Sequence, residues 1–144
     1  MQTTKSHPSR MPCLTAVLRM AGLRPTRQRL ALAELLFGGP HRHVSAEQLH
    51  GEAVTSNVNV SLATIYNTLH QFHQAGLLRE VPVEASRYYF DTDTSDHHHF
   101  YVEDEQRMID IPASSVVFGS LPKPPKGMSV SHVDVVIRVR RQPI

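Results

Sequence analysis

Apolar side chains recur with the period of an α-helix through the first half of the chain. Leu14, Val17, Leu18 and Ala21 follow the spacing i, i+3, i+4, i+7, which places them on one helical face. Gly22 comes directly after them, where glycine commonly ends a helix. The pattern therefore predicts a first helix that ends at this glycine.

Three further helices are predicted from their start and stop signals. The residues that can cap their first turns are Thr26, Ser45 and Ser61. The helix after Thr26 ends at the sequence Gly-Gly-Pro, and the helix after Ser61 ends at Gly76. Ser45 is followed three residues later by Gln48, the spacing of a capping box. We therefore expect four helices before residue 77.

The second half of the chain changes to the composition of β-strands. Residues 78–83 and 87–92 are β-rich and flank the sequence Glu-Ala-Ser, which predicts a hairpin. Residues 97–103 and 107–111 predict two more strands, joined by a turn at Asp-Glu-Gln. Residues 110–121 predict a short helix, and the β-branched residues in 128–140 predict a long strand buried in part on both faces. Together with the four helices, these strands predict an α+β fold.

Composition and charge narrow the class of protein. The single cysteine, Cys13, excludes an internal disulfide and a cysteine-based tetrahedral zinc site. The first ten residues have no apolar run typical of a secretory signal, and no apolar stretch has the length of a membrane span, so we expect a cytoplasmic protein with no membrane partner. Residues 1–90 hold nine basic and five acidic side chains, whereas residues 91–144 hold six and eight. A basic first half can bind a polyanion, and an acidic second half can bind a cation.

Four helices followed by a hairpin is the element order of a winged helix-turn-helix, in which the recognition helix enters the major groove of DNA. In the fourth predicted helix the apolar stripe consists of Leu62, Ile65, Leu69 and Phe72. The residues expected in or beside the groove are Ser61, Ala63, Thr64, Tyr66 and Asn67. Phosphate contacts are expected from Arg24, Thr26 and Arg27. The alternative is an ordinary amphipathic helix with a solvated polar face.

The run FDTDTSDHHHFYVED concentrates imidazoles and carboxylates. In a strand, His97 and His99 project to one face and His98 to the other. Asp91 lies just before the run, and His43 precedes the third predicted helix. Two or three imidazoles with a carboxylate suit zinc, iron or manganese. The alternative is a solvated polar turn.

Four segments together resemble the ferric uptake regulator family: GLRPTRQRLALAELLF, HRHVSAEQLH, VSLATIYNTLHQFHQAGLLRE and YYFDTDTSDHHHFYVED. Within the family they are most similar to the iron response regulator branch. The resemblance implies a homodimeric transcription regulator of iron and haem metabolism genes. The polar first residues, with two prolines, predict a flexible arm at 1–12. The resemblance implies a winged-helix DNA-binding domain at 13–92 and an α/β dimerisation and sensing domain at 93–144. It also implies that Tyr66 contacts double-stranded DNA, and we expect the two-fold dimer to bind an inverted-repeat operator.

The resemblance also implies ligand sites. The regulatory metal site would consist of His43, Asp91, His97 and His99, at the hinge between the domains. A second metal or haem site would use Asp96 and His98 together with His97 and His99. In the iron response regulator branch the triple histidine is associated with haem, so haem or a haem-delivering protein is a possible partner.

This chain departs from the family pattern in two respects. The Cys-Pro haem motif of some members is reversed here, at Pro12-Cys13. The paired cysteines that hold structural zinc in many members are absent, so the dimer core would depend on apolar packing by Val133, Val135, Ile137 and Val139. Two other function classes stay open: a small metallo-enzyme that uses His97, His99 and Asp91, and a haem-binding protein without DNA binding.

Overall fold

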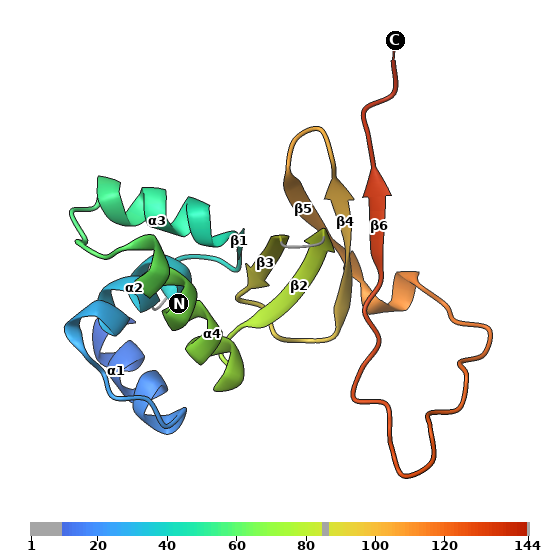
Figure 1. The fold of residues 1–144 in the computed structure, drawn as a ribbon, viewed down its shortest axis with the longest axis horizontal. Helices are drawn as coiled ribbons and strands as arrows, with labels where there is room; N and C mark the ends of the chain where they lie inside the picture. Colours follow the sequence, from blue (N-terminus) through green and yellow to red (C-terminus); the bar gives the residue numbers. More distant parts are fainter. Residues whose placement is uncertain (1–9, 85–86, 144) are drawn as a thin grey trace, which may run out of the picture. The chain divides into compact units, whose positions relative to one another are not determined.

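The computed structural model describes residues 10–84 and 87–143 (Figure 1). The chain forms two compact units, the first ending at Thr94 and the second beginning at Ser95. The first contains the helices and a small sheet, and the second contains a separate sheet, so the predicted α+β class is confirmed. Residues 1–9 of the predicted flexible arm lie outside the described residues, and residues 10–12 of that arm belong instead to the first helix.

The first unit contains the four predicted helices, drawn in blue to green in Figure 1. They are α1 (Arg10–Met20), α2 (Arg27–Phe37), α3 (Ala46–Thr55) and α4 (Leu62–Gln74). Thr26, Ser45 and Ser61 each accept a hydrogen bond from a backbone N–H three residues later, and Gln48 completes the capping box at Ser45. Gly22 follows α1 with a φ of 82°, the left-handed conformation that favours glycine. The predicted helix boundaries are therefore confirmed at their caps.

The core of the first unit lies between these helices. Leu18, Leu32 and Leu36 from α1 and α2 are fully buried. The predicted stripe on α4 packs against them: Ile65, Leu69 and Phe72 are fully buried, and Leu62 is partly buried. Burial of such apolar side chains stabilises the unit by about 1.5–3 kcal/mol each. The opposite face of α4, which includes Ala63 and Asn67, is exposed.

The sheet of the first unit has the strand order β1-β3-β2, with antiparallel pairing throughout. The hairpin strands β2 (Arg79–Glu84) and β3 (Arg87–Asp91) confirm the predicted hairpin. Part of its predicted turn, at residues 85 and 86, lies outside the described residues. The two-residue strand β1 (His43–Val44) was not predicted, because so short a pairing has no sequence period.

The second unit is built on a sheet of order β5-β4-β6, drawn in yellow-brown to red in Figure 1. The antiparallel strands β4 (His97–Val102) and β5 (Arg107–Pro112) confirm the predicted pair and its turn. Strand β6 (Val136–Val139) runs parallel to β4 on the other side. Arg140 donates to Glu103 Oε1 at 2.8 Å, and Arg141 pairs with Glu105, so these ion pairs connect the chain after β6 to the β4–β5 turn.

Two predicted elements of the second unit are much shorter in the structure than the sequence predicts. The helix expected at 110–121 is reduced to a 3-10 turn at Ala113–Ser115, because β5 extends through Pro112 and Gly119 and Pro122 disfavour a longer helix. The strand expected at 128–140 is limited to β6. It does not extend further back along β4 because the N–H of Val135 donates to the His98 side chain instead of to a strand backbone. Of the four valine and isoleucine residues expected on its apolar face, only Ile137 and Val139 lie in the strand.

Candidate metal centre and nucleic-acid surface

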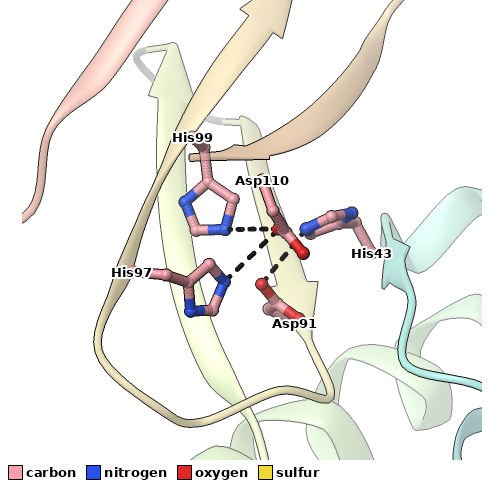
Figure 2. Close-up of side chains that lie close together, drawn as sticks. All are labelled: His43, Asp91, His97, His99 and Asp110. Atoms are coloured by element: carbon pink, nitrogen blue, oxygen red, sulfur yellow. Dashed lines mark ion pairs between the residues drawn. The ribbon is translucent and has the colours of Figure 1, made fainter. Parts of the chain in front are cut away.

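His97, His99 and Asp110 form one cluster in the second unit (Figure 2). Strand β4 projects both histidines to one face, with ring centroids 4.6 Å apart, and the antiparallel register places Asp110 of β5 opposite His99. Asp110 Oδ1 lies 3.4 Å from Nε2 of His97 and 3.6 Å from Nε2 of His99. Both imidazoles are buried, whereas the carboxylate is about half exposed. The predicted alternation of the three histidines is therefore confirmed in its geometry.

The hydrogen bonding of His97 is that of an imidazole that can bind a metal ion through Nε2. His97 Nδ1 lies 2.7 Å from the carbonyl oxygen of Ser95. A carbonyl can only accept, so Nδ1 carries the hydrogen, and in the neutral ring Nε2 presents a lone pair toward Asp110. When the ring is neutral, this lone pair and the nearby Asp110 oxygen can both act as ligands of one cation. Imidazole and carboxylate ligands suit zinc, iron or manganese.

His43 and Asp91 form a second donor pair, in the first unit (Figure 2). They are directly opposite each other in the β1–β3 register, and His43 Nε2 lies 3.1 Å from Asp91 Oδ2. Asp91 is only 1% exposed, and its Oδ1 accepts a hydrogen bond from the N–H of Asp93 at 2.9 Å. The short strand β1 thus explains how two residues far apart in sequence present their donor atoms together.

Arg42 anchors the segment that carries His43. Its backbone N–H donates to Thr92 Oγ1 at 2.9 Å, and the N–H of Thr92 donates back to the Arg42 carbonyl at 3.1 Å. Its guanidinium donates to both carboxylate oxygens of Glu52 on α3, at 2.7 and 2.5 Å. These hydrogen bonds raise the pKa of Arg42 above its ordinary value, although partial burial opposes the shift. The chain on either side of the His43–Asp91 pair is therefore fixed to α3.

His98 lies on the opposite face of β4 from His97 and His99. Its Nδ1 accepts a hydrogen bond from the N–H of Val135 at 3.1 Å, and its ring packs edge-on against Phe118 at a centroid distance of 5.9 Å. Asp96 is exposed in the bend before β4. The donor cluster found among the described residues includes neither of them.

The metal-site residues expected from the sequence thus fall into two groups, one in each unit. His43 and Asp91 are together in the first, and His97 and His99 are together in the second. Asp110 is the donor that sequence reasoning missed. No local signal places it there, because Asp110 lies opposite His99 only with the turn and register that the structure shows.

The expected DNA-contacting residues on α4 surround its N-terminus. Ser61 caps the helix and donates to Thr64 Oγ1 at 3.0 Å, so both hydroxyls are used in the cap. Ala63 and Asn67 are exposed one helical turn apart. Tyr66 is partly buried against the core, and its hydroxyl donates to Glu47 Oε2 on α3 at 2.7 Å.

The expected phosphate-binding residues lie at the start of α2. Arg24 and Arg27 are exposed, whereas the hydroxyl of Thr26 caps the helix by accepting from the N–H of Arg29 at 3.2 Å. The Arg29 guanidinium donates to the Arg24 carbonyl and to Gln71 Oε1 of α4, each at 3.0 Å. Arg29 therefore fixes the orientation of α4 against the start of α2, which leaves Arg24 and Arg27 as the exposed cations there.

Among the described residues, no helix combines the length and the apolar character that crossing a bilayer requires.

Known proteins similar to this chain are regulators. The ferric uptake regulation protein of Bordetella parapertussis is 35% identical over 81 residues, which cover 56% of this chain and 58% of that protein. The peroxide-responsive repressor of Staphylococcus aureus is 35% identical over 95 residues, covering 66% of this chain and 64% of the repressor. The matched segments therefore span less than two thirds of these relatives.

Solved structures of the same kind match over most of the chain. The ferric uptake regulator of Pseudomonas aeruginosa, solved with manganese, has a TM-score of 0.67 at 26% identity and covers 90% of this chain and 98% of its own. The ferric uptake regulator of Vibrio cholerae has a TM-score of 0.71 at 22% identity and covers 89% and 99%, which supports the fold. The sequence profile of the ferric uptake regulator family matches residues 20–136. Members of that family are metal-responsive transcription regulators and not enzymes. On its fold and its sequence, this chain belongs to the ferric uptake regulator family.

Proposed function

We propose that this protein is an iron-responsive, DNA-binding transcription regulator of the iron response regulator branch, acting in the cytoplasm on genes of iron and haem metabolism. The observation that carries the proposal is the cluster of buried imidazoles facing a carboxylate on β4 and β5, in a chain that also contains a winged helix. The family assignment supports the general activity. The triple histidine run supports the branch.

The proposed metal site uses both donor groups. Residues 92–96 are all that separates Asp91 from His97 in the chain, so one ion could be shared by the two groups without a long connecting segment. His43, Asp91, His97, His99 and Asp110 would then supply three imidazoles and two carboxylates, a donor set that suits divalent iron, manganese or zinc. The manganese in the Pseudomonas aeruginosa structure is consistent with this class of ion. When bound, the ion would link the two units and so bias their arrangement, which is a switch by differential binding.

The proposed DNA contacts divide into two kinds. Arg24, Thr26 and Arg27 would hold phosphates, Thr26 chiefly through the free N–H groups of the helix start that it caps. On α4, Ala63, Tyr66 and Asn67 would face base edges, whereas Ser61 and Thr64 would set the helix start beside the backbone. The side chains of Arg27 and Asn67 are both exposed, so Arg27 represents the proposed phosphate contacts and Asn67 the proposed base contacts.

The proposed homodimer would form through the second unit. This unit of about 50 residues buries few apolar side chains, and Ile109 and Ile137 are each 40% exposed. Both are paired with Phe100 across the sheet, so they lie in one row on the face opposite His97 and His99. A unit of this size is only marginally stable unless a partner covers this apolar row. A two-fold dimer would present two α4 helices to an inverted-repeat operator.

Haem binding stays a prediction for His97, His98, His99 and Asp96. The three imidazoles do not face one way, because His98 is engaged by Val135 on the other face. An absorption spectrum of the protein with added haem tests this directly: a Soret shift lost on replacement of the three histidines would support ligation. The metallo-enzyme alternative is disfavoured by the family, whose members are regulators.

The regulator proposal is tested by DNA binding of the purified protein. We would measure affinity for promoter fragments of iron genes and for a random duplex, with and without manganese, over a range of salt concentrations. Arg27→Ala should weaken both duplexes equally and reduce the salt slope by about one unit. Asn67→Ala should weaken the specific fragment alone, by about 1–3 kcal/mol. Absence of binding to any duplex would refute the proposal.

A further inference from the structure

We infer that Glu47 is a positioning residue for Tyr66, and that their contact makes the recognition surface selective for sequence. The inference rests on the proposed function, since it concerns how the same surface reads DNA. It assigns a role to an acidic residue in α3, outside the helix expected to enter the groove.

The contact joins two elements that the sequence keeps apart. The Tyr66 hydroxyl on α4 donates to Glu47 Oε2 at 2.7 Å, the short distance of a bond between a hydroxyl and a carboxylate. Glu47 lies in the first turn of α3, where a negative charge is favoured by the helix dipole. The base of the Tyr66 ring packs against the core. The side chain is therefore fixed at both ends, by the core at its ring and by Glu47 at its hydroxyl.

The hydrogen bond from Tyr66 is the largest influence on the pKa of Glu47, ahead of its own backbone N–H and the charge of Arg87. Glu47 is an exposed carboxylate near a surface that we expect to face phosphates, where negative charge opposes binding. The hydrogen bond from Tyr66 lowers the pKa of Glu47, and the same bond raises the pKa of Tyr66, so the pair is an ionised carboxylate and a neutral phenol at neutral pH. A residue that works against affinity in this place is better explained by selectivity.

The chemistry of the pair gives the mechanism. A phenol has one hydrogen to donate, and here Tyr66 donates it in the hydrogen bond to Glu47. Tyr66 then offers to the duplex only oxygen lone pairs and the ring itself, which suit the amino groups and the thymine methyl of base edges. Without Glu47 the hydroxyl would be free to rotate and to donate to a phosphate of any sequence. Holding the phenol also reduces the entropy lost on binding the operator.

The test compares variants that separate the hydrogen-bond acceptor from the charge. Glu47→Gln keeps an oxygen that can accept from Tyr66 and removes the charge, so affinity for the specific fragment and for random DNA should both rise and their ratio should stay unchanged. Glu47→Ala also removes the acceptor, so the ratio should fall by about three- to tenfold. In a Tyr66→Phe background, Glu47→Ala and Glu47→Gln should give the same ratio. Glu34→Gln, an equal change of charge on α2, is the matched control.

A second readout follows the phenol itself. With 3-fluorotyrosine in place of tyrosine, the ¹⁹F signal of Tyr66 is identified by its loss in Tyr66→Phe. The pKa of the Tyr66 phenol, followed by this signal, should fall in Glu47→Ala because the carboxylate that raises it is removed. The inference is overturned if Glu47→Ala and Glu47→Gln have equal specificity ratios when Tyr66 is present. It is also overturned if Glu47→Ala lowers the specificity ratio by the same factor in the Tyr66→Phe background. If the unaltered protein binds no duplex at all, the proposed function fails instead.

Discussion

Replacement of Glu52 by alanine tests how the first unit holds its donor pair. In the structure both carboxylate oxygens of Glu52 accept from Arg42, whose backbone is in turn bonded to Thr92, the residue next to Asp91. The substitution removes the two charge-assisted bonds and leaves the guanidinium bonded to the Leu35 carbonyl at 3.2 Å. The anchor of the His43 segment on α3 is thereby lost.

The size of the effect follows from the exposure of the pair. The side chains of Arg42 and Glu52 are 31% and 37% exposed, so water screens the pair and can solvate Arg42 after the change. The cost should lie between that of an exposed ion pair, about 0.2–1 kcal/mol, and that of a broken buried pair, about 3–5 kcal/mol. We expect a loss of about 1–2 kcal/mol in the free energy of unfolding. Residues that orient metal ligands commonly change affinity by 10-fold or more, so we also expect about 10-fold weaker manganese binding.

The assay is urea unfolding followed by circular dichroism in metal-free buffer, together with a calorimetric manganese titration. Glu84→Ala is the control, since it removes an exposed carboxylate from the end of β2 and should change stability by less than about 0.5 kcal/mol. The reasoning would be refuted if Glu52→Ala unfolded at the same urea concentration as Glu84→Ala and bound manganese as tightly.

Three further predictions concern single contacts. Asp110→Asn should weaken manganese binding by about 10-fold or more in a calorimetric titration, because it removes the negative charge that faces His97 and His99; equal affinity would exclude Asp110 from the site. Ser45→Ala removes the side chain that caps α3 and should lower the free energy of unfolding by about 1 kcal/mol in urea, whereas a shift no larger than that of an exposed serine would contradict the role of the cap. Because the bond from Tyr66 lowers the pKa of Glu47, the pair contributes to stability above the ordinary pKa of a glutamate and loses that contribution as pH falls through the lower folded value; the acid side of a stability–pH curve should therefore be shallower in Tyr66→Phe, and identical curves would count against the contact.

The first unit was predictable because its signals are local. The starts of α2, α3 and α4 each have a serine or threonine whose side chain accepts from the N–H three residues on, and all three caps are present in the structure. The hairpin likewise depends on neighbouring segments. The sequence did not reveal β1, whose two residues are held by pairing with residues of β3 that lie 46 and 48 positions later in the chain.

The second unit was less predictable because its elements depend on distant partners. The apolar residues in 128–140 have the composition of a strand, yet only the four residues that pair with β4 form one. Val135 gives its N–H to His98, a contact between residues 37 apart that no local pattern predicts. The same dependence hid Asp110, since its position opposite His99 follows from the register and not from the sequence around it.

We propose that a divalent ion held by the histidine–aspartate groups controls how the protein binds DNA. The most direct measurement is a titration of the purified protein with manganese, in which bound metal and affinity for an iron-gene promoter fragment are followed in the same samples. We expect promoter affinity to change in step with occupancy of the site, and replacement of His97 and His99 together to abolish both the metal binding and the change in affinity. Promoter affinity that stays constant while the site fills, or metal binding that survives loss of both histidines, would contradict it.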